Sequence, residues 1–260
     1  MPSYRDYCPI AAAVDLLGDR WTPLVIRELM VGAGGFNEIH RGIPRISRSL
    51  LAQRLRLLEH NGLVERRPRP GESASDYVLT PAGRDLEPIL WALGRWATRW
   101  MLGDPADEQL DTPHLVWRLH QVTNHERAPK KRTTVEFRTL GAGAGRAWLV
   151  FDGGRSTACQ IDPGFDVDLV VEGDNRTLHS WFLGRVTWRD ARASGAVTLL
   201  GPTRLASSFP SWFDPSAFYN EVRAATRAQR RRHLVVRRTR QDGEATQPHG
   251  AGAGVSPRPG

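Results

Sequence analysis

The first hundred residues carry helix signals in a fixed order, and this order constrains the fold more than any other feature of the chain. Apolar residues recur at helical spacing in four short segments, each bounded by proline, serine, aspartate or glycine. The spacing predicts helices over residues 10–17, 19–31, 36–42 and 47–60, with Asp19 as a candidate N-cap of the second. Short amphipathic helices in this order must pack around one shared core.

The fourth segment has two distinct faces. Ser47 can cap it, and Leu51, Leu55 and Leu58 form an apolar stripe before Asn61-Gly62 ends the helix. The opposite stripe consists of Ser49, Gln53, Arg56 and His60. We expect the leucine face to pack on the core and the polar face to remain available for binding.

A hairpin and a long helix follow. Residues 63–67 and 76–79 are extended runs, and the segment between them is rich in proline, glycine and arginine, which predicts a hairpin with a basic tip. Thr80-Pro81 then starts a long helix that keeps the core period to Trp100, and its interior Pro88 is expected to kink it. A break follows at residues 103–105.

This order of elements is that of a winged helix-turn-helix. In the major groove of DNA, Arg pairs with guanine and Gln with adenine, while Ser and backbone amides hold phosphate. Residues 45–69 contain seven Arg against two Glu, which concentrates positive charge where phosphates would lie. A single amphipathic helix usually only packs on a core, and a single run of arginines is usually only solvated. Because these elements occur together and in this order, they favour double-stranded DNA as a partner. The candidate DNA-binding residues are Arg45, Ser47, Arg48, Ser49, Gln53, Arg54, Arg56, Arg66, Arg67 and Arg69.

The same region resembles the HxlR-type transcriptional regulators over about residues 7–102. The matching motifs include Cys8-Pro9-Ile10, Leu17-Gly18-Asp19-Arg20-Trp21, Phe36-Asn37-Glu38-Ile39 and Tyr77-Val78-Leu79-Thr80. The resemblance implies a bacterial repressor or activator that forms a homodimer through its first and last helices. Such a dimer reads two half-sites about 34 Å, or about ten base pairs, apart.

Cys8 stands where the N-cap of the first helix is expected. The positive end of a helix dipole raises the reactivity of a thiol. The resemblance implies that this cysteine is a candidate sensor of oxidants or electrophiles. The other interpretation is an unreactive cysteine packed beneath the helices, and the sequence leaves both open.

The second half has a different pattern, with strands in a run rather than in regular alternation with helices. The predicted strands are residues 134–138, 147–151, 157–161, 166–171 and 197–200, and the predicted helices are 176–183, 188–193 and 202–212. This pattern indicates an α+β fold with a mainly antiparallel sheet.

The second half carries no catalytic motif, which favours a protein that is not an enzyme and has no cofactor. There is no nucleophile elbow or phosphate loop, and His114, His120 and His125 are too irregularly spaced for a metal site. Asp162, Asp166 and Asp168 are interpreted as the solvated side of an alternating strand rather than as a cation site.

Aromatic residues are frequent in the second half and fit either an ordinary core or an apolar ligand cavity. Residues 148–152, 162–169 and 181–184 are similar to sterol-carrier-protein-2-like (SCP2-like) domains, and this resemblance implies a lipid-like or otherwise apolar small ligand. The candidate cavity residues are Phe137, Trp148, Val150, Phe165, Val167, Leu169, Trp181, Phe182 and Phe209.

The net charge of +8 is concentrated near the end of the chain, because residues 223–260 carry nine Arg and two acids. We expect four parts: a DNA-binding and dimerisation domain over 1–104, a linker over 105–112, an α+β domain over 113–226 and a basic, disordered tail over 227–260. Two cysteines, no signal peptide and no apolar run near the ~20 residues that span a bilayer predict a cytoplasmic protein without membrane insertion.

The sequence therefore predicts a DNA-binding transcriptional regulator that is modulated by an apolar ligand. Three alternatives stay open: a lipid- or sterol-binding protein that uses the winged helix only to dimerise, an enzyme with a fused DNA-binding domain, and DNA binding by the basic tail.

Overall fold

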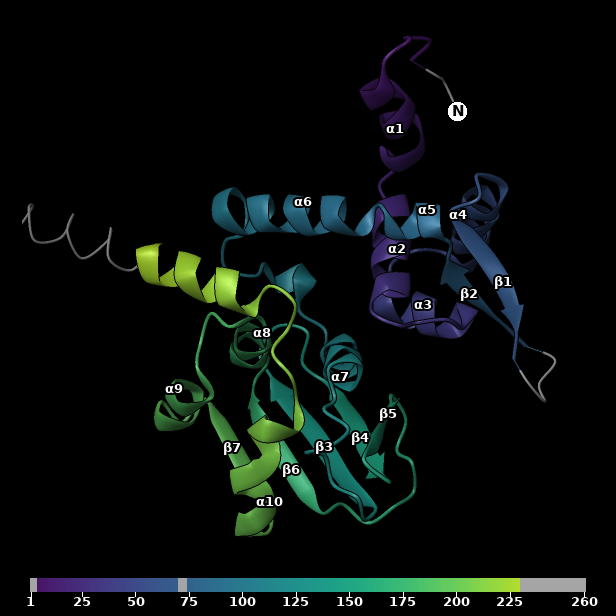
Figure 1. Cartoon of the computed structure of the whole chain (residues 1–260). Helices are drawn as coiled ribbons and strands as arrows, with labels where there is room; N and C mark the ends of the chain where they lie inside the picture. Colours follow the sequence, from purple (N-terminus) through teal and green to yellow (C-terminus); the bar gives the residue numbers. More distant parts are fainter. Residues whose placement is uncertain (1–3, 70–73, 230–260) are drawn as a thin grey trace, which may run out of the picture.

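A computed structural model describes residues 4–69 and 74–229 of the chain, so the hairpin tip and residues 230–260 of the predicted basic tail lie outside the described residues. Residues 227–229, which the sequence assigns to the disordered tail, are instead the end of a helix. The described residues form two units (Figure 1). Each unit has its own cluster of buried apolar side chains. None of the described helices is long and apolar enough to span a bilayer.

The first unit is a winged helix-turn-helix, as the sequence predicts. Its elements are α1 (Pro9–Leu17), α2 (Thr22–Met30), α3 (Phe36–Gly42), α4 (Arg48–His60), β1 (Val64–Pro68), β2 (Ser75–Leu79), α5 (Pro81–Arg84) and α6 (Glu87–Trp100). The strands β1 and β2 pair antiparallel, with Val64 opposite Leu79. Leu51, Leu55 and Leu58 of α4 are fully buried in the core of this unit. The hairpin extends away from the rest of the molecule (Figure 1).

Two helix boundaries in this unit differ from the prediction. The N-cap of α2 is Trp21 rather than Asp19, whose carboxylate accepts a hydrogen bond from the Trp21 backbone N–H at 3.0 Å. The long helix with a kink at Pro88 is instead two helices, α5 and α6. Pro88 lies in the first turn of α6, where the N–H that proline lacks has no helical partner to lose.

The second unit is a five-stranded sheet with helices. Its elements are η1 (Asp107–Gln109), α7 (Thr112–Gln121), β3 (Thr133–Leu140), β4 (Arg146–Asp152), β5 (Arg155–Cys159), β6 (Leu169–Asp174), α8 (Asn175–Leu183), α9 (Trp188–Ala193), β7 (Val197–Leu200), α10 (Thr203–Ser208) and η2 (Phe209–Trp212), followed by a helix over 219–229. The strand order is β5-β4-β3-β6-β7. The predicted α+β class is confirmed for the chain as a whole.

The sheet is mixed, so the prediction of a mainly antiparallel sheet is wrong. The central strands β3 and β6 run parallel, with Val135 opposite Leu169, while the other neighbouring strands pair antiparallel. Residues 160–168 carry the chain from the edge strand β5 past β4 and β3, so that β6 joins the far side of β3 in the same direction. Strand patterns in a sequence do not specify this pairing.

Residues 166–168 of the predicted strand 166–171 are not part of a strand, because β6 begins only at Leu169. Asp168 instead exchanges two hydrogen bonds with Thr134: its carboxylate accepts the Thr134 N–H at 2.8 Å, and its own N–H donates to the Thr134 carbonyl at 2.9 Å. Asp162 accepts the Gly164 N–H at 2.9 Å in a turn. These carboxylates therefore order the β5–β6 connection rather than forming the solvated face of a strand.

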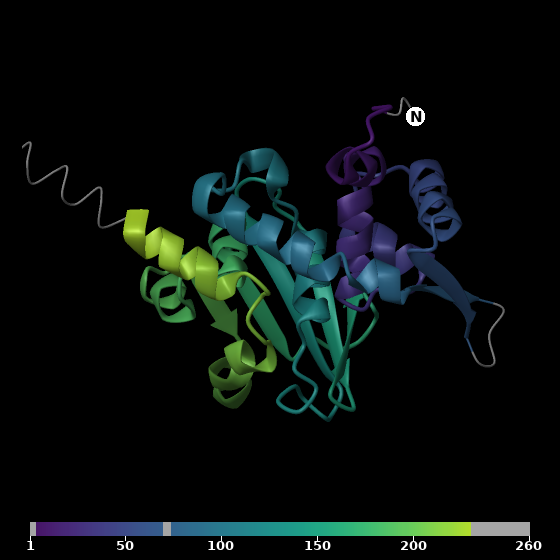
Figure 2. The same cartoon turned by 45° about the horizontal axis from the view of Figure 1, so that its top comes forward.

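Two helices of the second unit are absent from the prediction. α7 has a clear start signal, since the Asp111 carboxylate accepts the His114 N–H at 2.7 Å and Pro113 lies in the first turn. The helix over 219–229 lies alongside α6 of the first unit in both views (Figures 1 and 2). The segment predicted as one helix over 202–212 is split into α10 and the 3-10 helix η2.

Candidate nucleic-acid interface

The polar stripe of α4 is exposed along the helix. Ser47 is the N-cap, and its hydroxyl accepts the Leu50 N–H at 3.3 Å. Ser49, Gln53 and Arg56 are all exposed on the side opposite the buried leucines. The structure therefore brings these four predicted residues together on one surface.

Arg54 does not belong to this surface, although the sequence predicts it among the DNA-binding residues. Its side chain is 9% exposed, and its guanidinium lies 2.6 Å from the carboxylate of Asp19. This ion pair ties the segment between α1 and α2 to α4. The position of Arg54 between Gln53 and Leu55 on the helix turns it toward the core, so its role is structural.

Arg45 and Arg48 flank the start of α4, and both are exposed. The Arg48 guanidinium donates to the Asn37 side-chain carbonyl at 2.9 Å and lies over the Phe36 ring, 6.0 Å from its centroid. These contacts join α4 to the first turn of α3. Both arginines lie within two residues of Ser47, the N-cap at which the polar stripe of α4 begins.

The hairpin carries three arginines with different surroundings. Arg66 is exposed and lies 5.2 Å from the centroid of the Tyr77 ring, and Arg67 is exposed and paired with Glu65 at 2.5 Å. Arg69 is held between Asp76 at 2.6 Å and Glu38 at 3.6 Å. Arg66 and Arg67 are therefore exposed to solvent, whereas Arg69 pairs most closely with Asp76 within the hairpin and has a longer contact to Glu38 of α3.

The first unit is similar to a known protein family. Residues 16–104 match the family model described as HxlR-like helix-turn-helix. The uncharacterized HTH-type transcriptional regulator YvaP of Bacillus subtilis is 38% identical over 103 residues, which are 39% of this chain and 94% of YvaP. This chain belongs to the HxlR-like helix-turn-helix family.

Two further comparisons concern the same region of this HxlR-like chain. The HTH-type transcriptional regulator YodB of B. subtilis is 39% identical over 102 residues, which are 38% of this chain and 89% of YodB. The solved structure of the reduced form of YodB from B. subtilis is 39% identical, covers 37% of this chain and 96% of that chain, and has a TM-score of 0.33. These proteins correspond in length to the winged helix-turn-helix alone.

Cys8 occupies the N-cap position of α1, as the sequence predicts, with φ −132° and ψ 127°. Its side chain is half-buried, and α1 has no buried residue in the single chain. The second cysteine, Cys159 of β5, is also half-buried, and burial raises the pKa of its thiol despite the nearby Arg41.

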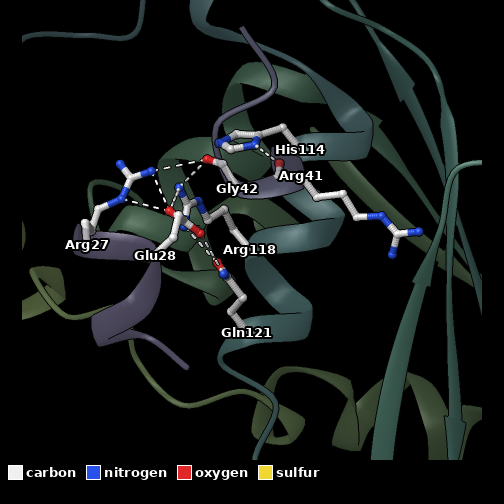
Figure 3. A network of polar contacts seen from close by, with 7 residues as sticks. All are labelled: Arg27, Glu28, Arg41, Gly42, His114, Arg118 and Gln121. Atoms are coloured by element: carbon white, nitrogen blue, oxygen red, sulfur yellow. Dashed lines mark hydrogen bonds and ion pairs between the residues drawn. The ribbon is translucent and has the colours of Figure 1, made fainter. Parts of the chain in front are cut away.

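A buried ionic network joins the two units (Figure 3). The sequence patterns do not predict it. The side chain of Glu28 on α2 is completely buried. Its carboxylate lies 2.8 Å from the Arg118 guanidinium of α7 and 2.6 Å from that of Arg27, and it accepts the Gln121 amide N–H at 2.9 Å. Arg118 also donates to the Gly42 carbonyl at the end of α3, at 2.8 Å. The second unit is thus docked on the two helices that precede α4.

The network shifts two pKa values. Burial alone would raise the pKa of Glu28, but the guanidinium groups of Arg118 and Arg27 outweigh it and hold that pKa below its usual value. Burial, aided by Arg118, lowers the pKa of His114 to about 4, and its ring Nδ1 lies 3.4 Å from the Arg41 carbonyl. Glu28 is therefore ionised and His114 neutral at pH 7.

The nine predicted cavity residues do not line one cavity in the part of the chain that the structure describes. Phe137, Leu169 and Phe209 are fully buried in the core of the second unit, and Trp148 and Val150 are at most 9% exposed. Phe165 and Val167 are exposed. Trp181 and Phe182 line a pocket that has a volume of about 220 Å³. Most of these aromatic and branched side chains build the core, because a sheet covered by short helices needs large apolar residues to fill the space between them.

Proposed function

We propose that this protein is a DNA-binding transcriptional regulator that acts as a homodimer. The observation that carries the proposal is the exposed stripe of Ser49, Gln53 and Arg56 on α4, in a unit whose family has relatives named as transcriptional regulators. A helix with a leucine face in the core and hydrogen-bonding side chains outside has the form that enters the major groove.

The proposed contacts divide into two kinds. Gln53 and Arg56 point outward from the middle of α4 and are proposed to read base edges. Ser47 and Ser49 lie at the N-terminus of the same helix, where hydroxyl and backbone N–H groups suit phosphate. Arg45, Arg48, Arg66 and Arg67 are proposed to hold the DNA backbone on either side.

The dimer is supported by an apolar stripe on α6. Ile89, Leu93, Trp96 and Trp100 recur at helical spacing and are 54%, 55%, 53% and 65% exposed in the single chain. Ile10 of α1 is 73% exposed as well. Contiguous exposed apolar residues of this size mark an association surface, and a two-fold dimer would bury the same surface of both chains.

The DNA proposal is tested by fluorescence anisotropy with DNA from the region upstream of the protein's own coding sequence. Replacing Gln53 and Arg56 together with alanine is expected to weaken binding to the preferred site by at least about thirtyfold, because each base contact contributes about 1–3 kcal/mol. The control is Arg204→Ala on α10, which removes one exposed positive charge far from α4. Weak, non-selective binding that the double substitution leaves intact would refute the proposal and favour a lipid-binding protein that uses the winged helix only to dimerise.

The dimer is tested by light scattering. Wild type is expected at twice the 29.0 kDa mass of one chain, and Leu93→Glu is expected to shift it to the monomer mass. Ile161→Glu is the matched control, because Ile161 is an equally apolar residue, 82% exposed, on the second unit. A dimer that survives Leu93→Glu would place the association surface elsewhere.

The second unit is proposed to modulate DNA binding through an apolar small molecule. The pocket beside Trp181 and Phe182 supports this, as does the docking of α7 on α2 and α3 through Glu28. The similarity of residues 148–152, 162–169 and 181–184 to SCP2-like domains is part of the same proposal. A titration with apolar ligands that leaves the DNA affinity unchanged would remove this part of it alone.

A further inference from the structure

The pocket of the second unit lies where α7, α8 and the segment after η2 meet. Its volume is about 220 Å³, and five of its ten lining residues are aromatic. Its lining includes Leu119, Val122, Trp181, Phe182, Trp188 and Tyr219. The rings of Trp181 and Trp188 lie 4.7 Å apart at 53° and form one wall.

The walls select a small, flat and uncharged molecule. The carboxylate of Asp214 also reaches the pocket, but it is paired with Arg127 and accepts the Asn124 amide N–H at 3.0 Å, so its charge is already compensated. Apolar cavities of about 150 Å³ hold benzene, and drug-sized ligands need about 300 Å³ or more. The pocket volume of 220 Å³ therefore fits an aromatic molecule of one or two rings.

α7 connects this pocket to the winged helix. Leu119 and Val122 line the pocket, while Arg118 and Gln121 hold the buried Glu28 of α2. The two pairs alternate along one helical turn, so a shift or rotation of α7 that accommodates a ligand also moves the groups that fix α2 and the end of α3 (Figure 3).

Two adjacent residues make a second connection, to α6. Tyr219 lines the pocket and packs on Gly184 at the end of α8, where a Cβ atom would come within 2.7 Å of the tyrosine ring. Its neighbour Phe218 lies 5.2 Å from Trp91 of α6, centroid to centroid, in an edge-on contact. A change at the pocket therefore reaches the helix that carries the proposed dimer stripe.

We infer that this pocket binds a neutral aromatic molecule of one or two rings and that occupancy changes DNA affinity through α7 and through Phe218. The inference rests on the proposed function and deepens it, because it names the class of ligand and the contacts that transmit its binding. The ligand must bind one state of the dimer more tightly than the other, because a ligand that binds both states equally does not shift the equilibrium between them. These two states differ in the relative position of α2, α3 and α6.

Binding is tested by calorimetric titration of the full chain with 2-naphthol. Wild type is expected to bind, and Val122→Phe, which fills the pocket, and Phe182→Ala, which removes a wall, are each expected to weaken binding at least tenfold. Circular dichroism and thermal unfolding check that both variants fold. Val122→Phe reduces the volume of the pocket and Phe182→Ala increases it, so the two variants test the pocket in opposite ways. Absence of binding by wild type, or variants that bind as wild type does, would overturn the inference.

Coupling is tested by DNA anisotropy with and without saturating 2-naphthol. Wild type is expected to change its DNA affinity at least fivefold, a typical coupling between sites, and Phe218→Ala, which keeps the pocket lining, is expected to reduce that change. An unchanged DNA affinity of wild type, or an equal change in Phe218→Ala, overturns the proposed transmission. Wild type that binds no DNA refutes the proposed function instead, and the calorimetric result still decides whether the pocket binds the ligand.

Discussion

Replacing Arg118 with leucine removes the central cation of the junction between the two units. The variant loses the ion pair with Glu28 at 2.8 Å and the hydrogen bond to the Gly42 carbonyl at 2.8 Å. Glu28 keeps Arg27 at 2.6 Å and Gln121 at 2.9 Å, so its fully buried carboxylate retains two partners.

The expected loss of unfolding free energy is about 3 kcal/mol. Removing one partner of a buried ion pair costs about 3–5 kcal/mol, and the partners that Glu28 retains place this substitution at the lower end. The loss should depend on pH. In wild type the pKa of Glu28 is lowered, so its contribution to stability is full above its ordinary value of 4.5 and falls as acid protonates it. Without Arg118, burial raises that pKa, so the difference between wild type and variant is largest near pH 7 and smaller near pH 4.

Urea unfolding followed by tryptophan fluorescence at pH 7 and pH 4 measures both effects. Arg132→Leu is the matched control, because Arg132 forms an exposed pair with Asp152 at 3.4 Å that should contribute less than about 1 kcal/mol. A double substitution with Glu28→Gln should be less destabilising than the sum of the two single ones. If the free energy of unfolding of Arg118→Leu at pH 7 lies within about 0.5 kcal/mol of that of wild type, the Arg118 contacts do not hold the two units together.

Three further outcomes are expected. The pKa of His114 is about 4 in the folded protein, so between pH 6.5 and pH 4 the unfolded chain binds a proton that the folded chain does not. The free energy of unfolding should therefore fall by up to about 3 kcal/mol over this range. His114→Asn should flatten that part of the curve of stability against pH. Cys8 should react with iodoacetamide faster than Cys159, because burial raises the pKa of the Cys159 thiol. Mass spectrometry of the native protein at successive times measures both rates of alkylation. If Cys8 reacts more slowly, it is no longer a candidate sensor. Gly94→Ala should destabilise by about 1–3 kcal/mol in thermal unfolding, although alanine favours helices, because the added Cβ would lie 2.1 Å from the Phe218 ring. A stabilised variant would show that Phe218 does not pack tightly on α6.

The sequence by itself determined the local structure of the winged helix. Ser47 and the leucines at steps of four and three define α4 and its two faces, and Pro9 marks the start of α1. These signals succeed because capping and helical periodicity act between residues within a turn or two of each other. The exposed positions of Ser49, Gln53 and Arg56 follow from the same periodicity.

The tertiary structure decided which polar groups are buried and how the strands pair. Arg54 and Arg56 are the same residue type two positions apart, yet only Arg54 meets a carboxylate in the core, that of Asp19. Glu28 occupies an ordinary amphipathic helix, and its carboxylate is fully buried in the tertiary structure, where it meets Arg118, ninety residues away, and Gln121. The parallel pairing of β3 with β6 likewise depends on the path of residues 160–168. Burial, ion pairing and strand order arise from contacts between residues distant in sequence, and short-range patterns do not encode them.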